Sequence, residues 1–345
     1  MKNWMIYGAN GYSGELIARY ANDKGLKPIL AGRNQASIES LAKELDCEFR
    51  VFDLSIQSDI VKNLDDIDAV IHCAGPFSAT AEPMVKSCLE SKTHYLDITG
   101  EIAVFEMAKS YDKQAKEAGI VLCPGVGFDV IPTDCLASQL KEIMPDATHL
   151  ALGFDSKSGF SPGTAKTSVE GLSKGGRVRK DGEIIQVPLA FKTRKIDFGA
   201  GEKLAMTIPW GDVSTAHFTT HIPNIEVYIP ASPNLVKKLK RMNYIRPLLG
   251  LGFVQNFLKK RIEKSVRGPS EKTRAKLNTY LWGEVKNAND EVKTLRLECS
   301  NGYTLTMTGG VKMIEHVLNT EKSGYYTPTT LVNNQLLKEI EGYYQ

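Results

Sequence analysis

The stretch W-M-I-Y-G-A-N-G-Y-S-G, residues 4–14, decides the fold of this chain. Its first four residues are apolar and predict a short strand, and the residues after it follow a helical pattern. Three glycines stand between strand and helix. Gly8 permits a tight turn, Gly11 lets backbone N–H groups approach an anion, and Gly14 lets the helix pack closely on the strand. This order is typical of the start of a dinucleotide-binding βαβ unit, in which the helix N-terminus faces the pyrophosphate.

The glycine spacing is G-x-x-G-x-x-G, whereas the commoner fingerprint is G-x-G-x-x-G. An ordinary glycine-rich turn is the alternative, since the chain contains 29 glycines and a loose match can arise by chance. The position directly behind an N-terminal strand favours cofactor binding. The loop residues expected to hold the cofactor are Gly8, Asn10, Gly11, Tyr12, Ser13 and Gly14.

Bulk properties narrow the class of protein. A chain of 345 residues predicts two domains, and 24% charged with 42% hydrophobic residues is ordinary for a globular protein. The net charge of +3 gives no reason to expect nucleic acid. Six scattered cysteines show neither a C-x-x-C pair nor a metal-like spacing with His, so we expect reduced thiols and no metal. No signal peptide and no apolar run of ~20 residues is present, which predicts a cytoplasmic protein unless a surface element takes it to a membrane.

The end of the second expected strand, residues 27–31, bears on the choice of cofactor. NAD-selective sites usually carry Asp or Glu there, to accept hydrogen bonds from the ribose. This chain has Gly32 and Arg33 instead. A guanidinium matches the 2′-phosphate of NADP, and no carboxylate repels it. NADP is therefore favoured over NAD, with a solvated turn arginine as the alternative.

Strands and helices alternate through the first 125 residues, which predicts a parallel, doubly wound sheet. Further strands are expected at 48–52, 69–73, 93–96 and 120–123, and helices at 37–45, 82–91 and 102–118. Asp53 ends one strand and either touches the adenine or caps a helix. Small residues after another strand would let the cofactor lie across it. These residues are Cys73, Ala74, Gly75 and Pro76.

Polar side chains at the carboxyl edge of the expected sheet are candidates for chemistry. Asp97 and Glu101 follow the fifth strand, on the side where open α/β sheets bind ligands. Each could contact substrate or cap the next helix. His72 and His94 lie within or beside strands, and we interpret both as packed or edge residues.

The chain resembles the short saccharopine-dehydrogenase-like oxidoreductases, a family that includes the trans-acting enoyl reductases of lipid synthesis. The matching stretches are residues 8–14, 30–33, 74–77, 93–101, 127–134, 163–168, 210–216, 222–228, 268–270, 302–306 and 326–328. The resemblance implies an NADP-type Rossmann domain, a second domain that covers the nicotinamide, and redox chemistry. It implies amino-acid substrates for the saccharopine type and carrier-bound acyl chains for the enoyl reductases. His221 departs from the pattern, since glycine is expected there, and it either alters a substrate pocket or lies in a surface turn.

The second half predicts an α+β domain over residues 126–310, built on a mostly antiparallel sheet. Asp129 either caps the helix expected at 131–144 or faces the cleft. Thr164 and Ser168 share a helical face that could bind a carboxylate or phosphate, or Thr164 is simply an N-cap. Arg177 and Arg179 are expected to be solvated in an exposed hairpin. Residues 311–345 are expected to return to the first domain.

Residues 231–276 carry 13 Lys or Arg against 2 Asp or Glu, with Leu, Ile and Phe interleaved. Such a basic amphipathic pattern can lie on anionic lipid or receive an acidic acyl carrier, although a solvated surface face is the alternative. No recognised nucleic-acid module accompanies it.

The sequence therefore predicts an NADP-dependent oxidoreductase that acts on a carbonyl, enoyl or imine substrate, with an acyl or lipid-linked one among the candidates. The alternatives are a saccharopine-type amino-acid dehydrogenase and a non-catalytic nucleotide-binding protein at a membrane or acyl carrier. An oligomer is compatible with the sequence. The candidate catalytic residues are Asp97, Glu101, Asp129, Thr164 and His217. His217 is chosen because imidazole titrates near neutral pH, and as an expected strand residue it could instead be packed.

Overall fold

The computed structural model describes residues 2–156, 171–257 and 277–341, and it divides into two compact units. The first unit comprises the residues up to Ile131 together with Gly302–Ile340, and the second comprises Pro132–Asn301 with Glu341. We expected these boundaries near 125 and 310. Within the described ranges, no helix combines the length and the apolar character that crossing a bilayer requires.

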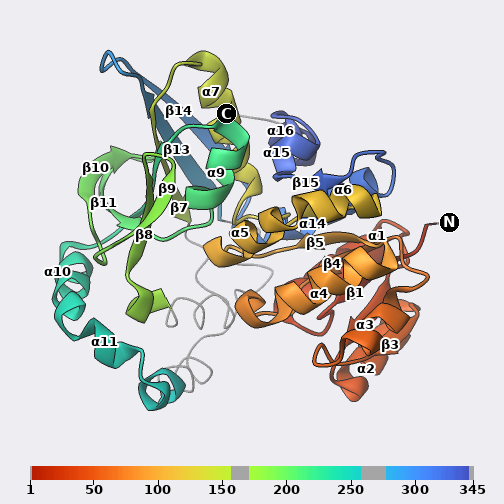
Figure 1. Ribbon diagram of the computed structural model, residues 1–345. Coiled ribbons are helices and arrows are strands. Elements are labelled where there is room, and N and C mark those ends of the chain that lie inside the picture. Colours follow the sequence, from red (N-terminus) through yellow and green to blue (C-terminus); the bar gives the residue numbers. More distant parts are fainter. Residues whose placement is uncertain (1, 157–170, 258–276, 342–345) are drawn as a thin grey trace. The chain divides into compact units, whose positions relative to one another are not determined.

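The first unit is built on a seven-stranded parallel sheet of order β15-β6-β5-β4-β1-β2-β3, so the predicted Rossmann-type fold is confirmed (Figure 1). Its strands are β1 (Trp4–Tyr7), β2 (Ile29–Gly32), β3 (Phe49–Val51), β4 (Ala69–His72), β5 (His94–Asp97), β6 (Val121–Cys123) and β15 (Gly324–Tyr325). The central strands are buried on both faces, as expected of a covered parallel sheet.

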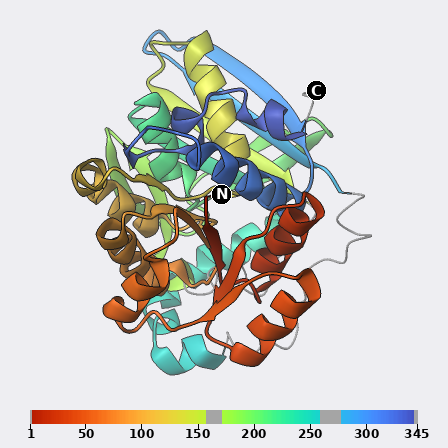
Figure 2. The same ribbon diagram turned by 90° about the vertical axis from the view of Figure 1, so that its right-hand side faces the viewer.

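Helices cover both faces of this sheet (Figures 1 and 2). They are α1 (Tyr12–Asp23), α2 (Gln35–Leu45), α3 (Gln57–Leu64), α4 (Phe77–Ser91), α5 (Ile102–Ser110), α6 (Asp112–Ala118), α14 (Gly302–Val317), α15 (Pro328–Leu331) and α16 (Leu336–Glu341). On one face Tyr7, Val70 and Tyr95 pack in a buried cluster with Leu64 of α3 and Met84 of α4. On the other face α1 packs against α14, a helix from the far end of the chain. The C-terminal segment thus belongs to the first sheet, where β15 pairs with β6.

Two helix predictions needed correction. The helix expected at 82–91 begins earlier, at Phe77. Pro83 therefore lies inside α4 and does not mark its start. The single helix expected at 102–118 is divided at Tyr111, whose ψ of 6° leaves the helical range and ends α5 before α6 begins.

The second unit contains an eight-stranded mixed sheet of order β10-β11-β12-β7-β13-β14, with β8 joined to β12 and β9. Its strands are β7 (His149–Ser156), β8 (Gly176–Lys180), β9 (Glu183–Val187), β10 (Thr193–Asp197), β11 (Glu202–Ile208), β12 (Asn224–Pro230), β13 (Thr279–Lys286) and β14 (Val292–Cys299). Only β12 and β7 run parallel among the described pairs, so the mostly antiparallel expectation is confirmed. Helix α7 (Ile131–Ile143) packs directly on β13, where a Cβ at Gly283 would come within 2.5 Å of Leu140 Cδ1.

The prediction that Arg179 is solvated was wrong. Arg179 lies in the expected hairpin of β8 and β9, but it is buried beneath α9 (Asp212–Thr220). Its Nε donates to the carbonyl of Val213 at 2.9 Å, and a second guanidinium nitrogen donates to the carbonyl of Gly182. The guanidinium therefore connects a helix to a hairpin. Arg177 is partly buried and donates to the carbonyls of Lys174 and Gly176.

We predict that Gly14→Ala destabilises the protein, although alanine is intrinsically the better helix former by about 1 kcal/mol. A Cβ at Gly14 would lie 2.3 Å from the carbonyl oxygen of Gly8, and backbone cannot yield as a flexible side chain does. We expect the free energy of unfolding in urea to fall by about 1–3 kcal/mol. Gly252→Ala is the control, because a Cβ there meets nothing within 4 Å. An unchanged unfolding midpoint for Gly14→Ala would contradict the prediction.

Candidate functional site

The glycine loop between β1 and α1, here called the glycine cradle, packs so closely on neighbouring backbone that side chains would not fit at Gly8 and Gly14. Gly8 has a φ of +82°, and a Cβ there would meet the backbone N of Ala74 at 2.8 Å. Gly11 is the N-cap of α1, and no side chain caps the helix at that residue. Glycine has no side chain that could accept from the first N–H groups of α1, which suits a diphosphate at this helix N-terminus.

The end of β2 carries the cation that the sequence singled out. The side chain of Arg33 is 76% exposed, and its nearest described carboxylate oxygen is Asp53 Oδ2 at 3.9 Å. The neighbouring Asn34 caps α2 by accepting a hydrogen bond from the backbone N of Ser37 at 3.0 Å. Helix α2 thus begins directly beside the guanidinium. An exposed arginine without an adjacent acid on β2 suits a phosphate monoester.

Asp53 does not cap a helix, so that alternative was wrong. Its Oδ1 accepts from the backbone N of Ser55 at 2.8 Å, while α3 begins later with Ile56 as its N-cap. Hydrogen bonding to Ser55, followed by the charge of Arg33, lowers the pKa of Asp53, so the carboxylate is ionised at neutral pH. Asp53 and Arg33 therefore form a charged pair beside the ends of β2 and β3.

The turn after β4 is held by a hydroxyl that the sequence analysis did not single out. Thr80, in the first turn of α4, donates to the carbonyl of Ala74 at 2.7 Å. Its Oγ1 also lies 3.0 Å from Nε2 of the buried His72. A hydroxyl that donates to Ala74 can still accept a hydrogen bond, so it can receive the Nε2–H of His72 in the tautomer that carries the proton there. His72 and Thr80 thus brace the turn of Cys73, Ala74, Gly75 and Pro76.

Burial sets the protonation of this brace. It lowers the pKa of His72 to about 3, so the imidazole stays neutral and can keep the tautomer that the brace requires. It also raises the pKa of the Cys73 thiol above its ordinary value, so Cys73 remains protonated. His72 was correctly interpreted as a packed residue: its ring lies near those of Tyr7, Phe77 and Tyr95.

Asp97 ties the ends of β5 and β6 together. Its carboxylate accepts from the Tyr95 hydroxyl at 2.6 Å, from the backbone N of Thr99 at 2.9 Å and from that of Gly125 at 2.8 Å. Burial raises the pKa of Asp97 to about 6, while these donors favour the charged form. Of the two uses expected for Asp97, capping the next helix is not observed. The side chain is fully buried and holds two loops at the carboxyl edge of the sheet.

Glu101 caps a helix, but not the one expected. Its carboxylate oxygens accept from the backbone N of Phe77 and of Ser78, each at 3.0 Å. These are the first two residues of α4, whereas α5, which follows Glu101 directly, receives no side-chain cap from it. The negative charge therefore occupies the N-terminus of α4. An anionic ligand is excluded from that helix end.

Asp129 lies against Gly100. A Cβ at Gly100 would come within 2.7 Å of Asp129 Oδ2, so the missing side chain makes room for the carboxylate. Burial raises the pKa of Asp129 from 3.8 to about 7. The loops after β5 and β6 thus bring together Asp97, Glu101 and Asp129. A carboxyl group that titrates near neutral pH can act as a general acid or base.

The remaining candidates belong to the second unit or lie outside the described residues. His217 lies on helix α9, which corrects the expectation that it is a strand residue, and its Nδ1 is 3.0 Å from the carbonyl oxygen of Ile222. His221 is the exposed C-cap of α9 with a φ of +58°. This left-handed position favours glycine, which explains why glycine is the expected residue there. Thr164 lies outside the described residues, and no metal-binding group of His, Cys, Asp and Glu occurs within them.

Thr80, Thr99 and Gly125 are the residues of this edge that sequence reasoning missed. A threonine in the first turn of a helix often bonds back to a preceding carbonyl, and this is the one signal that could have indicated Thr80. The Thr99 hydroxyl accepts from the backbone N of Glu101, but Thr99 and Gly125 both bond Asp97 through backbone N–H groups. Any residue supplies such a group, so no residue type identifies it in a sequence.

Comparison with known proteins agrees with this geometry. Residues 4–123 match the family model of the saccharopine dehydrogenase NADP binding domain. The chain is 27% identical over 274 residues to a lipid droplet localized protein of Caenorhabditis elegans, covering 70% of this chain and 63% of that protein. It is 28% identical over 138 residues to a trans-acting enoyl reductase of Mycobacterium ulcerans, covering 38% and 33%. The chain thus spans less than two thirds of the length of these curated relatives.

The fold is similar to that of a solved structure over its whole length. Saccharopine dehydrogenase (L-Glu forming) from Saccharomyces cerevisiae superposes with a TM-score of 0.66 at 14% identity, covering 100% of this chain and 98% of that one. Residues 4–123 thus resemble a saccharopine dehydrogenase NADP binding domain, and the resemblance inferred from the motifs is confirmed. The glycine cradle, the helix end without a side-chain cap and the exposed Arg33 suit that cofactor.

We predict that Thr80→Val loosens the turn after β4. The change removes the bonds to His72 and Ala74 while it keeps the shape of the side chain, and it should lower the free energy of unfolding by about 1–3 kcal/mol. It should also weaken NADPH binding, measured by fluorescence titration. Thr80→Ser retains the hydroxyl and should restore both quantities. Equal behaviour of the two variants would show that the hydroxyl does not brace the turn.

We predict that Asp129→Asn changes the pH dependence of stability. Because the folded-state pKa of Asp129 is raised to about 7 from 3.8, the folded protein binds the proton more tightly and loses stability as pH rises between these values. The asparagine variant has no such loss. Relative to wild type, its free energy of unfolding should therefore gain up to about 4 kcal/mol between about pH 4 and pH 7 and level off above.

The measurement is urea unfolding at a series of pH values. Asp23→Asn, which removes an exposed carboxylate of the same unit, is the matched control. A difference between Asp129→Asn and wild type that stays constant with pH would contradict the raised pKa.

Proposed function

We propose that the protein is an NADP-dependent oxidoreductase that transfers a hydride to or from a carbonyl, enoyl or imine substrate. One observation carries the proposal: an exposed Arg33 stands at the end of β2, without an acid on that strand, in a domain that matches an NADP-binding family. The glycine cradle supports it, because Gly8 and Gly14 allow α1 to pack closely on the loop and Gly11 places no capping side chain at the start of α1.

The residues of the first unit have distinct tasks in this proposal. The loop of Gly8, Asn10, Gly11, Tyr12, Ser13 and Gly14 holds the diphosphate, Arg33 binds the 2′-phosphate, and Asp53 lies beside the adenosine. The turn of Cys73, Ala74, Gly75 and Pro76 supports the cofactor across β4. When bound, NADP supplies or accepts the hydride. The chain itself positions the partners, and such positioning alone can lower a barrier by about 7–11 kcal/mol.

Asp129 is the proposed proton donor or acceptor among the candidates. Its pKa of about 7 lets it exchange a proton near neutral pH, and its carboxylate is placed against Gly100 in the loop after β5. Asp97 and Glu101 are proposed as positioning residues, because their carboxylates are already bonded to backbone N–H groups of neighbouring loops. For His217 the carbonyl of Ile222 beside its Nδ1 favours a packed role over a catalytic one.

The substrate that we propose is acyl or lipid-linked. The names of two relatives support this class, since one is a trans-acting enoyl reductase and the other a lipid droplet localized protein. A saccharopine-type amino-acid substrate is the second candidate, favoured by the fold shared with the yeast enzyme. Oxidation of NADPH with an enoyl or acyl thioester, and none with an amino acid plus a keto acid, would favour the acyl substrate over the amino-acid substrate.

We predict that wild-type protein binds NADPH more tightly than NADH and that Arg33→Ala removes this preference. Loss of a charge-assisted bond to phosphate of about 1.5–3 kcal/mol corresponds to a roughly ten- to hundredfold rise in the dissociation constant for NADPH. The constant for NADH should stay unchanged. Titration followed by nicotinamide fluorescence measures both.

Lys43→Ala provides the matched control, because it removes an equally exposed positive charge from the adjoining helix α2. It should leave both constants as they are. If wild type binds neither nucleotide, the oxidoreductase proposal fails. If Arg33→Ala weakens NADH and NADPH alike, Arg33 does not select for the phosphate.

A further inference from the structure

Residues 233–257 of the second unit, here called the basic segment, combine positive charge with exposed apolar side chains. The segment comprises α10 (Pro233–Met242), η1 (Asn243–Ile245), α11 (Arg246–Leu249) and a helical stretch at 252–257. It contains five Lys or Arg and no Asp or Glu. Of the 13 exposed large apolar side chains among the described residues, seven lie in it: Leu235, Tyr244, Ile245, Leu248, Leu251, Phe253 and Phe257.

One face of the basic segment is fixed to its own unit. Val236 is buried and Leu239 packs beside it, in a cluster with Ala190 and Met206. The side chain of Asn243 accepts from the backbone N of Leu189 at 2.8 Å and donates to its carbonyl at 3.2 Å. These contacts occupy the inward side of α10. Its remaining sides are left to the exterior.

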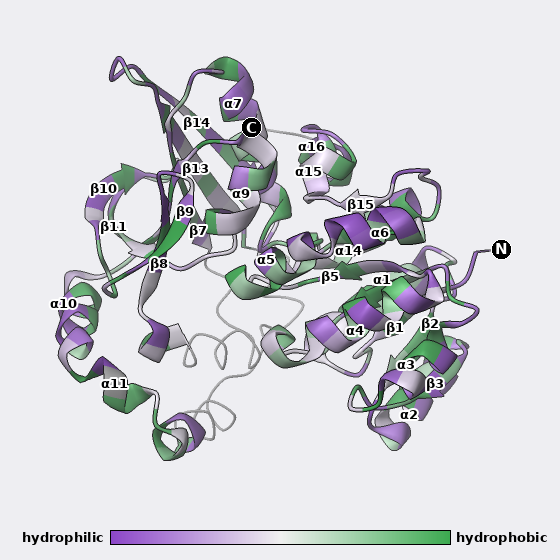
Figure 3. Ribbon diagram, in the orientation of Figure 1, coloured by the Kyte–Doolittle hydropathy of each residue, from purple (hydrophilic) through white to green (hydrophobic). Residues whose placement is uncertain are grey.

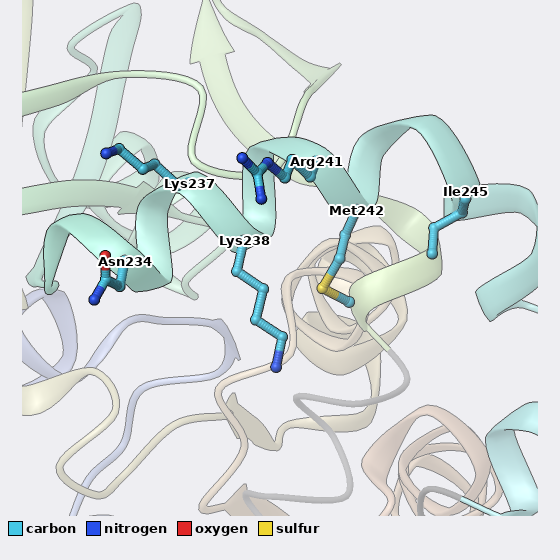
Figure 4. Close-up of a pocket in the computed structure, with 6 residues that line it drawn as sticks. All are labelled: Asn234, Lys237, Lys238, Arg241, Met242 and Ile245. Carbon is cyan, nitrogen blue, oxygen red and sulfur yellow. The ribbon is translucent and has the colours of Figure 1, made fainter.

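The outward side of α10 is cationic. Lys237, Lys238 and Arg241 line an open hollow of about 500 Å³ with Asn234, Met242 and Ile245 (Figure 4). Figure 4 shows the side chains of Lys238, Met242 and Ile245 extending to the same side of the segment. Hydrophilic and hydrophobic residues alternate along α10 and α11 in Figure 3. On the outward side, the cations Lys237, Lys238 and Arg241 are therefore interleaved with apolar side chains that line the same hollow.

The three aromatic side chains are the most exposed of the large apolar groups in the segment. Tyr244 is 89% exposed, Phe253 73% and Phe257 64%. A cluster of large apolar side chains exposed to water typically marks a surface that binds a protein, a membrane or a ligand. Cations interleaved with such side chains suit the interface of a bilayer, where Lys and Arg meet anionic headgroups while Phe, Tyr and Leu enter the boundary with the acyl chains.

We propose that the basic segment docks the protein on the surface of a membrane that contains anionic phospholipid. A bilayer accepts projecting aromatic side chains anywhere along the segment without a matching pocket. An acidic partner protein would pair with the cations of α10 but would leave Phe253 and Phe257 in water. The proposal does not rest on the redox function, because every residue in it belongs to the second unit.

The test is co-sedimentation of the full chain with lipid vesicles. Binding is expected to vesicles of phosphatidylcholine mixed with phosphatidylserine and to be much weaker with phosphatidylcholine alone. Raising the salt concentration should reduce the binding, since salt screens the headgroup attraction. Absence of binding to the mixed vesicles, at low salt, would overturn the proposal, as would equal binding to both kinds of vesicle.

Variants separate the two components of the surface. The triple variant K237A/K238A/R241A should lower partitioning onto mixed vesicles about a hundredfold, at roughly fivefold for each charge. Phe253→Ser and Tyr244→Ser should each lower it roughly tenfold. The matched control is K180A/K195A/K293A, which removes three exposed lysines of the same unit outside the segment. If the control triple lowers partitioning by the same factor, the effect depends on net charge alone, and the assignment to this segment is overturned.

Far-UV circular dichroism of the same samples shows whether each variant is folded, and NADPH titration of them distinguishes a loss of docking from a failure of the proposed function. A variant that binds NADPH normally but no longer sediments supports the docking surface. Wild type that sediments without binding any nucleotide supports it as well, while the redox proposal fails.

Discussion

The first unit depends on the close approach of helix α1 to the loop that precedes it. Gly14 lies so near the carbonyl of Gly8 that no side chain can stand between them. Gly8 in turn meets Ala74 at the end of β4. Because β1 lies between β2 and β4, this packing fixes the N-terminus of α1 relative to the middle of the sheet. The N–H groups of that helix end thereby gain a defined position, as binding of a diphosphate requires.

The neighbouring strand ends are held by polar side chains rather than by the sheet itself. Thr80 braces the turn after β4, Asp97 joins the loops after β5 and β6, and Glu101 links the β5 loop to the start of α4. Each bond contributes only about 0.5–1.5 kcal/mol to stability, or somewhat more where a charge takes part. Together they set the backbone at three adjacent strand ends, so their main consequence is geometric.

The first sheet could be predicted because its signals are local. Each strand is a short apolar run and each helix repeats with its own period, so the alternation and the parallel order follow. Strand β15 could not be found in this way, since its two residues carry no pattern and pair with β6 from the far end of the chain. The hairpin of β8 and β9 was recognised, but Arg179 was placed in solvent. Only α9, which arrives more than thirty residues later, buries it.

The same limit applies to the candidate site. Residue type and position at the sheet edge indicated Asp97, Glu101 and Asp129, yet their partners are backbone atoms that a sequence does not mark. Glu101 illustrates this best, because the nearest helix in sequence is α5 while the carboxylate binds the start of α4. Secondary structure alone cannot tell which helix N-terminus Glu101 caps, because the N-termini of α4 and α5 both lie at the same edge of the sheet. The decision comes from how the β5 loop turns, which Asp97 sets through the backbone N of Thr99.

These assignments restrict the chemistry that the first unit can contribute. Asp97 and Glu101 are bound to backbone donors, His72 is held neutral by burial, and burial keeps the Cys73 thiol protonated. Asp129, whose pKa is raised to about 7 by burial, is the group proposed for proton transfer. For the proposed oxidoreductase we therefore expect most of the rate to come from placing the reacting atoms and from fixed donors at the developing charge. The rigid polar bonding at the strand ends is the structural form that such catalysis requires.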